Sequence, residues 1–162
     1  MRCTLYRAVY QRYATEPIPS RSSSGRFHDA LSPGQTSYLA EDPATAWKEV
    51  ALHWGSTEQA YRMVEVEIEI QKILDLTDPS TRKRYGIKVE QLVSGDWSAC
   101  QQLANQLRRD GFQAVRTFSR ADQPDGRNVV VFLECLKPSH IKVKRRAAIK
   151  PGEYDKPSSS SR

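Results

Sequence analysis

The chain has 162 residues and a formal net charge of +6, and this length suits a single domain that buries a core without disulfide bonds. Its three cysteines lie far apart, and no cluster of cysteine and histidine has the spacing of a metal site, so we expect reduced thiols and no bound metal. No apolar run has the length of a signal peptide or a membrane span, so we expect a cytoplasmic protein.

The positive charge is concentrated at the end of the chain. Residues 139–162 hold seven basic and two acidic side chains, a net of +5, which leaves only +1 for residues 1–138. A nearly neutral body argues against a broad nucleic-acid groove, so we expect no direct binding to nucleic acid. Residues 147–162, which end in Pro-Ser-Ser-Ser-Ser-Arg, have the composition of a basic disordered tail. The folded domain is therefore predicted over residues 1–146.

The first predicted strand covers residues 5–10. It places Arg7 on the same side as Leu5 and Val9, an unusual position for a charge, which suggests a partner or a cleft. A loop rich in proline and serine follows over residues 16–24. It leads to Gly25-Arg26-Phe27, where a charged planar guanidinium stands beside a flexible backbone position.

The next strand, residues 36–40, carries Tyr38 and is followed by a helix. Asp42 can cap the first free N–H groups of this helix, and Pro43 at its first position sacrifices no hydrogen bond. Glu49 falls at the margin of the apolar side of the helix. Taken singly, a loop arginine, a strand tyrosine and a helix glutamate are usually structural. Together, Arg26, Tyr38 and Glu49 stand on three consecutive elements and can meet in one cleft.

The middle of the chain predicts core elements. Residues 61–70 alternate as a strand with one buried face, residues 80–85 form a short helical turn, and residues 96–109 form a long helix with one apolar stripe. That stripe begins with Trp97, and we interpret it as core packing.

The last part of the chain places polar residues at a strand end. A strand over residues 114–118 leads directly into Ser119 and Arg120, a position where binding sites are often built. Strands over residues 128–136 and 141–143 complete the order. This succession is mixed α+β, without a regular βα repeat and without a Gly-x-Gly-x-x-Gly or phosphate loop. A nucleotide would therefore be bound without a Rossmann fold.

Several short motifs occur here in a recognisable order. They are Leu5-Tyr6-Arg7, Gly25-Arg26-Phe27, Tyr38-Leu39-Ala40, Ala46-Trp47-Lys48-Glu49, Leu74-Asp75-Leu76-Thr77, Asp96-Trp97, and Ser119-Arg120 before an Asn-Val-Val-Val-Phe strand. In this order the chain resembles the RES-domain toxins, named for an arginine, a glutamate and a serine. The family often has Gly-Gly-Arg-Trp-Asn where this chain has Ser24-Gly25-Arg26-Phe27-His28, and its arginine after the serine is often one position later than Arg120.

The resemblance implies a fold like that of ADP-ribosyltransferases, a split mixed β-sheet with flanking helices around a cleft for NAD. It also implies an NAD glycohydrolase or NAD phosphorylase that cleaves the nicotinamide–ribose bond, with NAD as substrate and no metal. Glu49 and Arg26 would be catalytic, Glu49 by stabilising an oxocarbenium-like transition state and Arg26 by clamping the pyrophosphate. The residues expected to bind NAD are Arg7, Arg26, Tyr38, Ser119, Arg120 and Asn128.

Partners follow from the same resemblance. Such toxins are paired with Xre-type helix-turn-helix antitoxins in bacterial operons, and an acidic or carboxylate-ended peptide could enter a cleft that holds Arg26 and Arg120. The sequence leaves open whether water, phosphate or a protein accepts the ADP-ribose, and whether a homodimer forms within the antitoxin complex. A protein ADP-ribosyltransferase is the alternative, and a non-catalytic nucleic-acid-binding module using the basic tail is the third.

Overall fold

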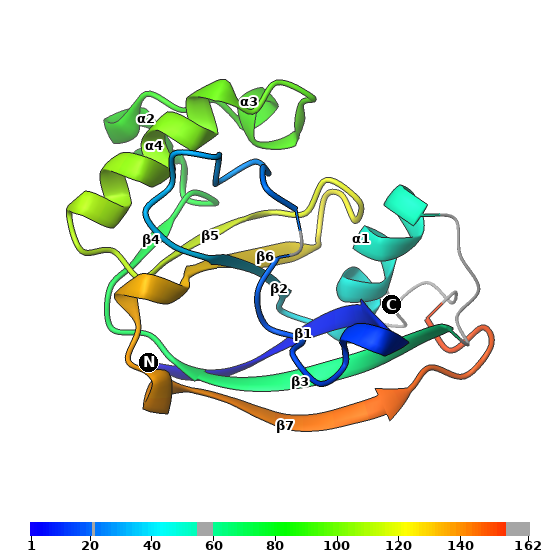
Figure 1. Cartoon of the computed structure of the whole chain (residues 1–162). Coiled ribbons are helices and arrows are strands. Elements are labelled where there is room, and N and C mark those ends of the chain that lie inside the picture. Colours follow the sequence, from blue (N-terminus) through cyan, green and yellow to red (C-terminus); the bar gives the residue numbers. More distant parts are fainter. Residues whose placement is uncertain (21, 55–59, 155–162) are drawn as a thin grey trace.

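The computed structural model describes residues 1–20, 22–54 and 60–154 and contains a seven-stranded mixed sheet (Figure 1). The strands are β1 (Arg2–Tyr10), β2 (Thr36–Ala40), β3 (Tyr61–Glu69), β4 (Ile73–Asp75), β5 (Ala114–Phe118), β6 (Arg127–Phe132) and β7 (Ile141–Ala148). Their order in the sheet is β4-β5-β6-β2-β1-β3-β7, with β4 and β5 parallel and the other neighbours antiparallel. The helices are α1 (Pro43–Trp54), α2 (Pro79–Tyr85), α3 (Val89–Val93) and α4 (Ser98–Arg109).

The sheet is split between β1 and β2. These two strands are in register at a single pair, Tyr6 with Ala40, whereas β1 pairs with β3 along its whole length and β2 pairs with β6 along its whole length. Two halves, β4-β5-β6-β2 and β1-β3-β7, therefore diverge from one point of contact. The prediction of an α+β fold with a split mixed sheet is confirmed.

Helices cover the two parts of the sheet separately. In Figure 1, α2, α3 and α4 lie together over β4 and β5, where buried residues such as Leu92, Leu107 and Phe132 form one apolar cluster. The other helix, α1, packs on the junction itself, because Ala8 of β1 and Ala40 of β2 leave room for its Ala46 and Trp47. Burial of these apolar groups holds α1 across the split.

Most elements fall where the sequence predicts them. The Asp42 cap of α1 is present, with the Thr45 N–H donating to Asp42 Oδ1 at 2.8 Å. Two elements were not predicted, β4 and α3, because segments of three and five residues are too short to show a period. The strand predicted to reach residue 136 ends at Phe132, since the chain turns there into a 3-10 helix (Leu133–Cys135).

The predicted tail begins too early. β7 continues to Ala148, Ile149 is buried, and Tyr154 packs against the cluster beneath α1. Residues 147–154 are therefore part of the fold, because a few apolar side chains in a polar segment are enough to anchor it on an existing core. Residues 155–162, the remainder of the predicted tail, lie outside the described residues.

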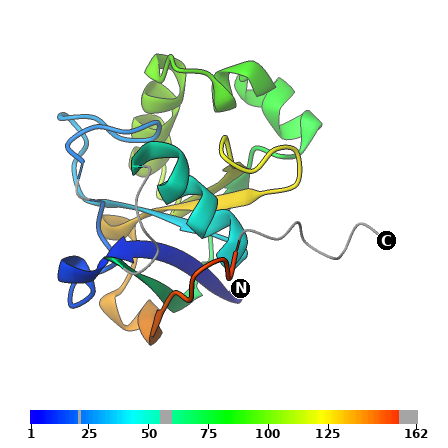
Figure 2. The ribbon, with the colours of Figure 1, turned by 90° about the vertical axis from the view of Figure 1, so that its right-hand side faces the viewer.

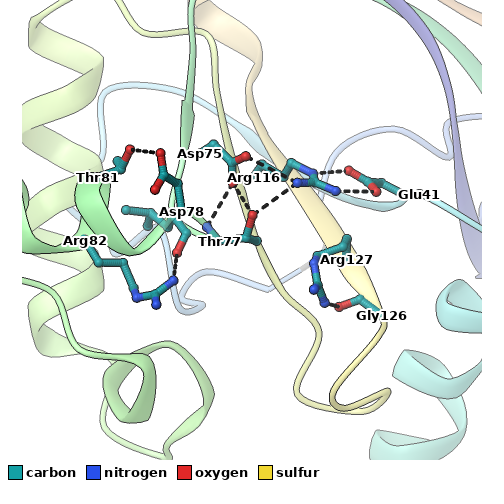
Figure 3. Close-up of polar contacts among 10 residues, drawn as sticks. Glu41, Asp75, Thr77, Asp78, Thr81, Arg82, Arg116, Gly126 and Arg127 are labelled. Carbon is teal, nitrogen blue, oxygen red and sulfur yellow. Dashed lines mark hydrogen bonds and ion pairs between the residues drawn. The ribbon is translucent and has the colours of Figure 1, made fainter.

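Two arginines tie elements together. Figure 3 shows Arg116 of β5 between Asp75 of β4 and Glu41, which follows β2; its Nη2 donates to Glu41 Oε2 at 3.1 Å and its Nη1 to Asp75 Oδ2 at 3.3 Å. Arg108 of α4 is the more deeply buried, with 5% of its surface exposed.

No helix within the described ranges is long and apolar enough to cross a membrane.

Arg108 joins α4 to β2 and to the end of β6. Its Nη1 donates to Glu134 Oε1 at 2.5 Å and to the Gly34 carbonyl at 3.3 Å, and its Nη2 donates to Thr36 Oγ1. The guanidinium also lies 4.5 Å from the centre of the Phe132 ring. The buried guanidinium of Arg108 is tolerated because its two terminal nitrogens donate hydrogen bonds and its plane contacts an aromatic ring.

Candidate active site

A cavity of about 930 Å³ opens where the two halves of the sheet diverge. Its walls come from β1, β2, α1, β5, β6, residues 16–20 and 22–28, and the segment after β5. Figure 2 faces α1 and shows the turn of residues 119–126, in yellow, beside it. The volume suits a ligand of nucleotide size. Of the seven predicted site residues, six border the cavity: Arg7, Arg26, Tyr38, Glu49, Arg120 and Asn128.

The cavity has a carboxylate held on one side. Glu49 Oε1 accepts hydrogen bonds from Ser119 Oγ and from Asn128 Nδ2, the latter at 3.0 Å. Within the described chain, the second oxygen, Oε2, accepts none. Three residues predicted from separate segments are thus brought together, and one carboxylate oxygen is positioned while the other is available to a ligand.

The turn after β5 is fixed on α1 by Asp122. This carboxylate accepts hydrogen bonds from Thr45 Oγ1 at 2.6 Å and Lys48 Nζ at 2.9 Å, and the Asp122 N–H donates to Ser119 Oγ at 3.1 Å. Burial raises the pKa of Asp122, but the hydrogen bonds from Thr45 and Lys48 outweigh burial and leave that pKa below its ordinary value. The position of Glu49 therefore depends on hydrogen bonds that run through Ser119 and Asp122 back to α1, the helix that carries Glu49.

The role predicted for Ser119 is corrected by this geometry. Ser119 has 0% of its surface exposed and does not border the cavity. Its hydroxyl already donates to Glu49 and accepts from Asp122. A side chain in this state orients the carboxylate and does not touch a ribose or phosphate.

Hydrogen bonds with neighbouring residues fix the position of the Tyr38 hydroxyl. His28 Nε2 lies 2.9 Å from the Ser22 carbonyl and must donate to it, so Nδ1 accepts from the Tyr38 hydroxyl at 2.8 Å. The Phe27 N–H also donates to this hydroxyl, and burial raises the pKa of Tyr38. Gly25 permits the arrangement, because a β carbon there would lie 2.7 Å from the Tyr38 oxygen.

The arginines differ in how far they are committed to the fold. Arg26 donates from Nη1 to the Gln91 carbonyl at 3.0 Å and from Nη2 to the Ser94 carbonyl at 2.5 Å, and burial lowers its pKa. Arg7 donates to the carbonyls of Pro17 and Ile18. The two terminal nitrogens of Arg26, which the family resemblance assigned to a pyrophosphate, thus already donate to the carbonyls of Gln91, in the middle of α3, and of Ser94, directly after α3.

Arg120 is an exposed arginine that borders the cavity, as does the exposed Arg12. It follows Ser119 directly. Burial is the main cause of the lowered pKa of Arg26, contacts with Cys100 act in the opposite direction, and the positive charge of Arg120 lowers that pKa further by a smaller amount. Among the described residues, the ion pairs do not include Arg120. Its guanidinium is thus free of ion pairs with them and well placed to receive an anionic ligand.

Trp97 and Thr117 are among the cavity residues that sequence reasoning missed. Trp97 was predicted as core, but it precedes α4, is 36% exposed and borders the cavity. Thr117 also borders the cavity, and its signal was its place on β5 two residues before Ser119, which directly follows that strand. The apolar periodicity alone does not show that Trp97, the first residue of the stripe, lies before the start of the helix.

The comparisons with known proteins agree with this architecture. The family model described as RES domain matches residues 4–154. Among solved structures, a chain of the crystal structure of the M. tuberculosis MbcT-MbcA toxin-antitoxin complex aligns with a TM-score of 0.80 at 22% sequence identity, over 96% of this chain and 88% of that chain. A search of curated proteins found no match. The structural likeness shows a shared fold.

Proposed function

Because this chain belongs to the RES domain family, we propose that it is the toxin of a bacterial toxin–antitoxin pair and depletes NAD by cleaving the nicotinamide–ribose bond. The observation that carries the proposal is the carboxylate of Glu49 in the cavity at the split, with one oxygen fixed and the other open to a ligand. The M. tuberculosis toxin-antitoxin complex with the same fold supports it.

Cleavage of the nicotinamide–ribose bond requires few catalytic groups beyond the Glu49 carboxylate. Cleavage of the nicotinamide–ribose bond passes through an oxocarbenium-like state, and a preorganised negative group stabilises the positive charge that develops on the sugar. Nicotinamide leaves as a neutral molecule, so the site needs no strong general acid. Tyr38, rigid and half-buried, offers an aromatic face to the nicotinamide ring.

The acceptor of the ADP-ribosyl group is decided by product analysis. Purified protein is incubated with NAD, with and without inorganic phosphate. ADP-ribose as the product identifies hydrolysis, its 1″-phosphate identifies phosphorolysis, and label on protein identifies ADP-ribosyl transfer. Intact NAD under all these conditions would exclude the proposed activity.

Ser119→Ala separates a positioning role from a binding role. We expect kcat for NAD cleavage to fall by about tenfold with little change in KM, because the carboxylate loses one of its two hydrogen bonds and the substrate loses no contact. Steady-state kinetics measures both. A rise in KM with unchanged kcat would return Ser119 to the binding role that the sequence suggested.

Arg120→Gln and Arg26→Lys should have different consequences. We expect Arg120→Gln to weaken NAD binding by about tenfold, most at low salt, without changing the Tm, because the arginine is exposed. Arg26→Lys should lower the Tm, because one ammonium cannot reach both the Gln91 and Ser94 carbonyls.

Titration calorimetry at two salt concentrations and thermal melts measure these effects, with Arg84→Gln on exposed α2 as the control. Unchanged affinity in Arg120→Gln would move the phosphate clamp to Arg26.

We further propose that the partner is an Xre-type helix-turn-helix antitoxin that inhibits by occupying the same cavity. An acidic or carboxylate-ended segment would pair with Arg120 at the cavity rim. Inhibition should then be competitive with NAD. Equal antitoxin affinity with and without saturating NAD would place its docking surface elsewhere.

A further inference from the structure

Two arginines from distant parts of the chain contact the ring of Phe118, the last residue of β5. The guanidinium carbon of Arg82, on α2, lies 5.6 Å from the centre of this ring, and that of Arg127, the cross-strand neighbour of Phe118 on β6, lies 4.6 Å from it. Cations are attracted to the face of an aromatic ring, and this attraction helps to hold both side chains in place. One ring therefore keeps two positive charges close together.

Neither of these charges is paired with a carboxylate within the described ranges. Figure 3 shows the contrast with Arg116, whose guanidinium lies between the carboxylates of Asp75 and Glu41. The Nη1 atoms of Arg82 and Arg127 donate to backbone carbonyls instead. The ion pairs of the described residues include neither arginine, and both residues are partly exposed. Because like charges repel each other, an anionic group from outside the chain would stabilise this pair.

The arginine pair, Arg82 and Arg127, lies beside the cavity and not in its wall. Phe118 borders the cavity and directly precedes Ser119, which donates to Glu49, whereas the two arginines do not border it. A molecule bound to the arginine pair would therefore lie next to the turn of residues 119–126 without occupying the space proposed for NAD.

We propose that the arginine pair is a docking surface for a partner protein that presents two carboxylates on successive turns of a helix. Acidic side chains at positions i and i+4 have β carbons about 5–6 Å apart, so each carboxylate can reach one guanidinium and accept two parallel hydrogen bonds from it. The net charge of only +1 over residues 1–138 disfavours a nucleic acid, because a phosphate backbone needs a longer row of basic residues. The assignment does not depend on cleavage of NAD.

A helical peptide tests this surface directly. The probe is a blocked alanine-rich helix with glutamates at positions i and i+4, and a peptide with glutamines at these positions is its control. In fluorescence anisotropy at low salt, we expect the glutamate peptide to bind more tightly, and Arg82→Gln/Arg127→Gln to lower its affinity by about tenfold. Lys142→Gln/Lys144→Gln removes the same charge from exposed positions of β7 and should leave that affinity unchanged. Equal affinity for the two peptides, or an equal loss in both double variants, would overturn the proposal.

Reversal of the charges and a nucleic acid complete the test. Arg82→Glu/Arg127→Glu should bind a peptide with lysines at positions i and i+4 and no longer bind the glutamate peptide, a gain that loss of folding cannot produce. Failure to bind the lysine peptide would overturn the docking surface. A single-stranded DNA oligonucleotide with the same number of charges as the glutamate peptide is measured in parallel. If the oligonucleotide binds more tightly through the arginine pair than that peptide does, the surface recognises nucleic acid and the proposal is wrong.

Discussion

Glu49→Gln should lower kcat for NAD cleavage by about a hundredfold or more while the protein stays folded. Glutamine has the same shape, and its carbonyl oxygen can still accept from Ser119 Oγ and Asn128 Nδ2. Only the negative charge is lost, and that charge is what stabilises the developing cation on the ribose. The size of the loss therefore reports electrostatic stabilisation directly.

Quantifying nicotinamide release under saturating NAD gives kcat, and a thermal melt confirms the fold. Glu90→Gln is the matched control, because Glu90 is exposed on α3 and does not border the cavity. Turnover in Glu49→Gln equal to that of the control would remove Glu49 from the mechanism.

Arg108→Met should destabilise the protein by about 3 kcal/mol, a drop in Tm of roughly 6 to 12 °C for a domain of this size. Methionine fills much of the same volume, but it leaves Glu134, Thr36 Oγ1 and the Gly34 carbonyl without their donor. These groups lie where α4, β2 and the end of β6 meet. We therefore expect the loss of their hydrogen bonds to destabilise the packing of the whole layer of helices on the sheet.

Arg109→Met controls for the change of charge, since Arg109 is the next residue on the same helix and is exposed. Urea unfolding of both variants gives the difference in free energy of unfolding. If the two variants unfold at the same urea concentration, the buried contacts of Arg108 contribute little net stability.

The sequence predicts the scaffold well and the contacts less well. β2, β5 and the start of α1 are recognisable because alternation, a proline and a capping aspartate are local signals. Glu49, Ser119 and Asn128 were each selected from their local setting, and the structure brings them together. The features that the sequence did not predict depend on contacts between residues far apart in the chain. Ser119 is buried by α1, and the partners of Arg26 lie 65 and 68 residues away.

The sheet edges show how this fold avoids aggregation. A strand at the edge of a sheet offers unpaired backbone groups to any other extended chain. One edge, β4, is only three residues long and is too short to template a partner. The other, β7, exposes Lys142, Lys144, Arg145 and Arg146, and two copies approaching edge to edge would bring these like charges together. The positive charge near the end of the chain thus opposes pairing of two copies at this edge.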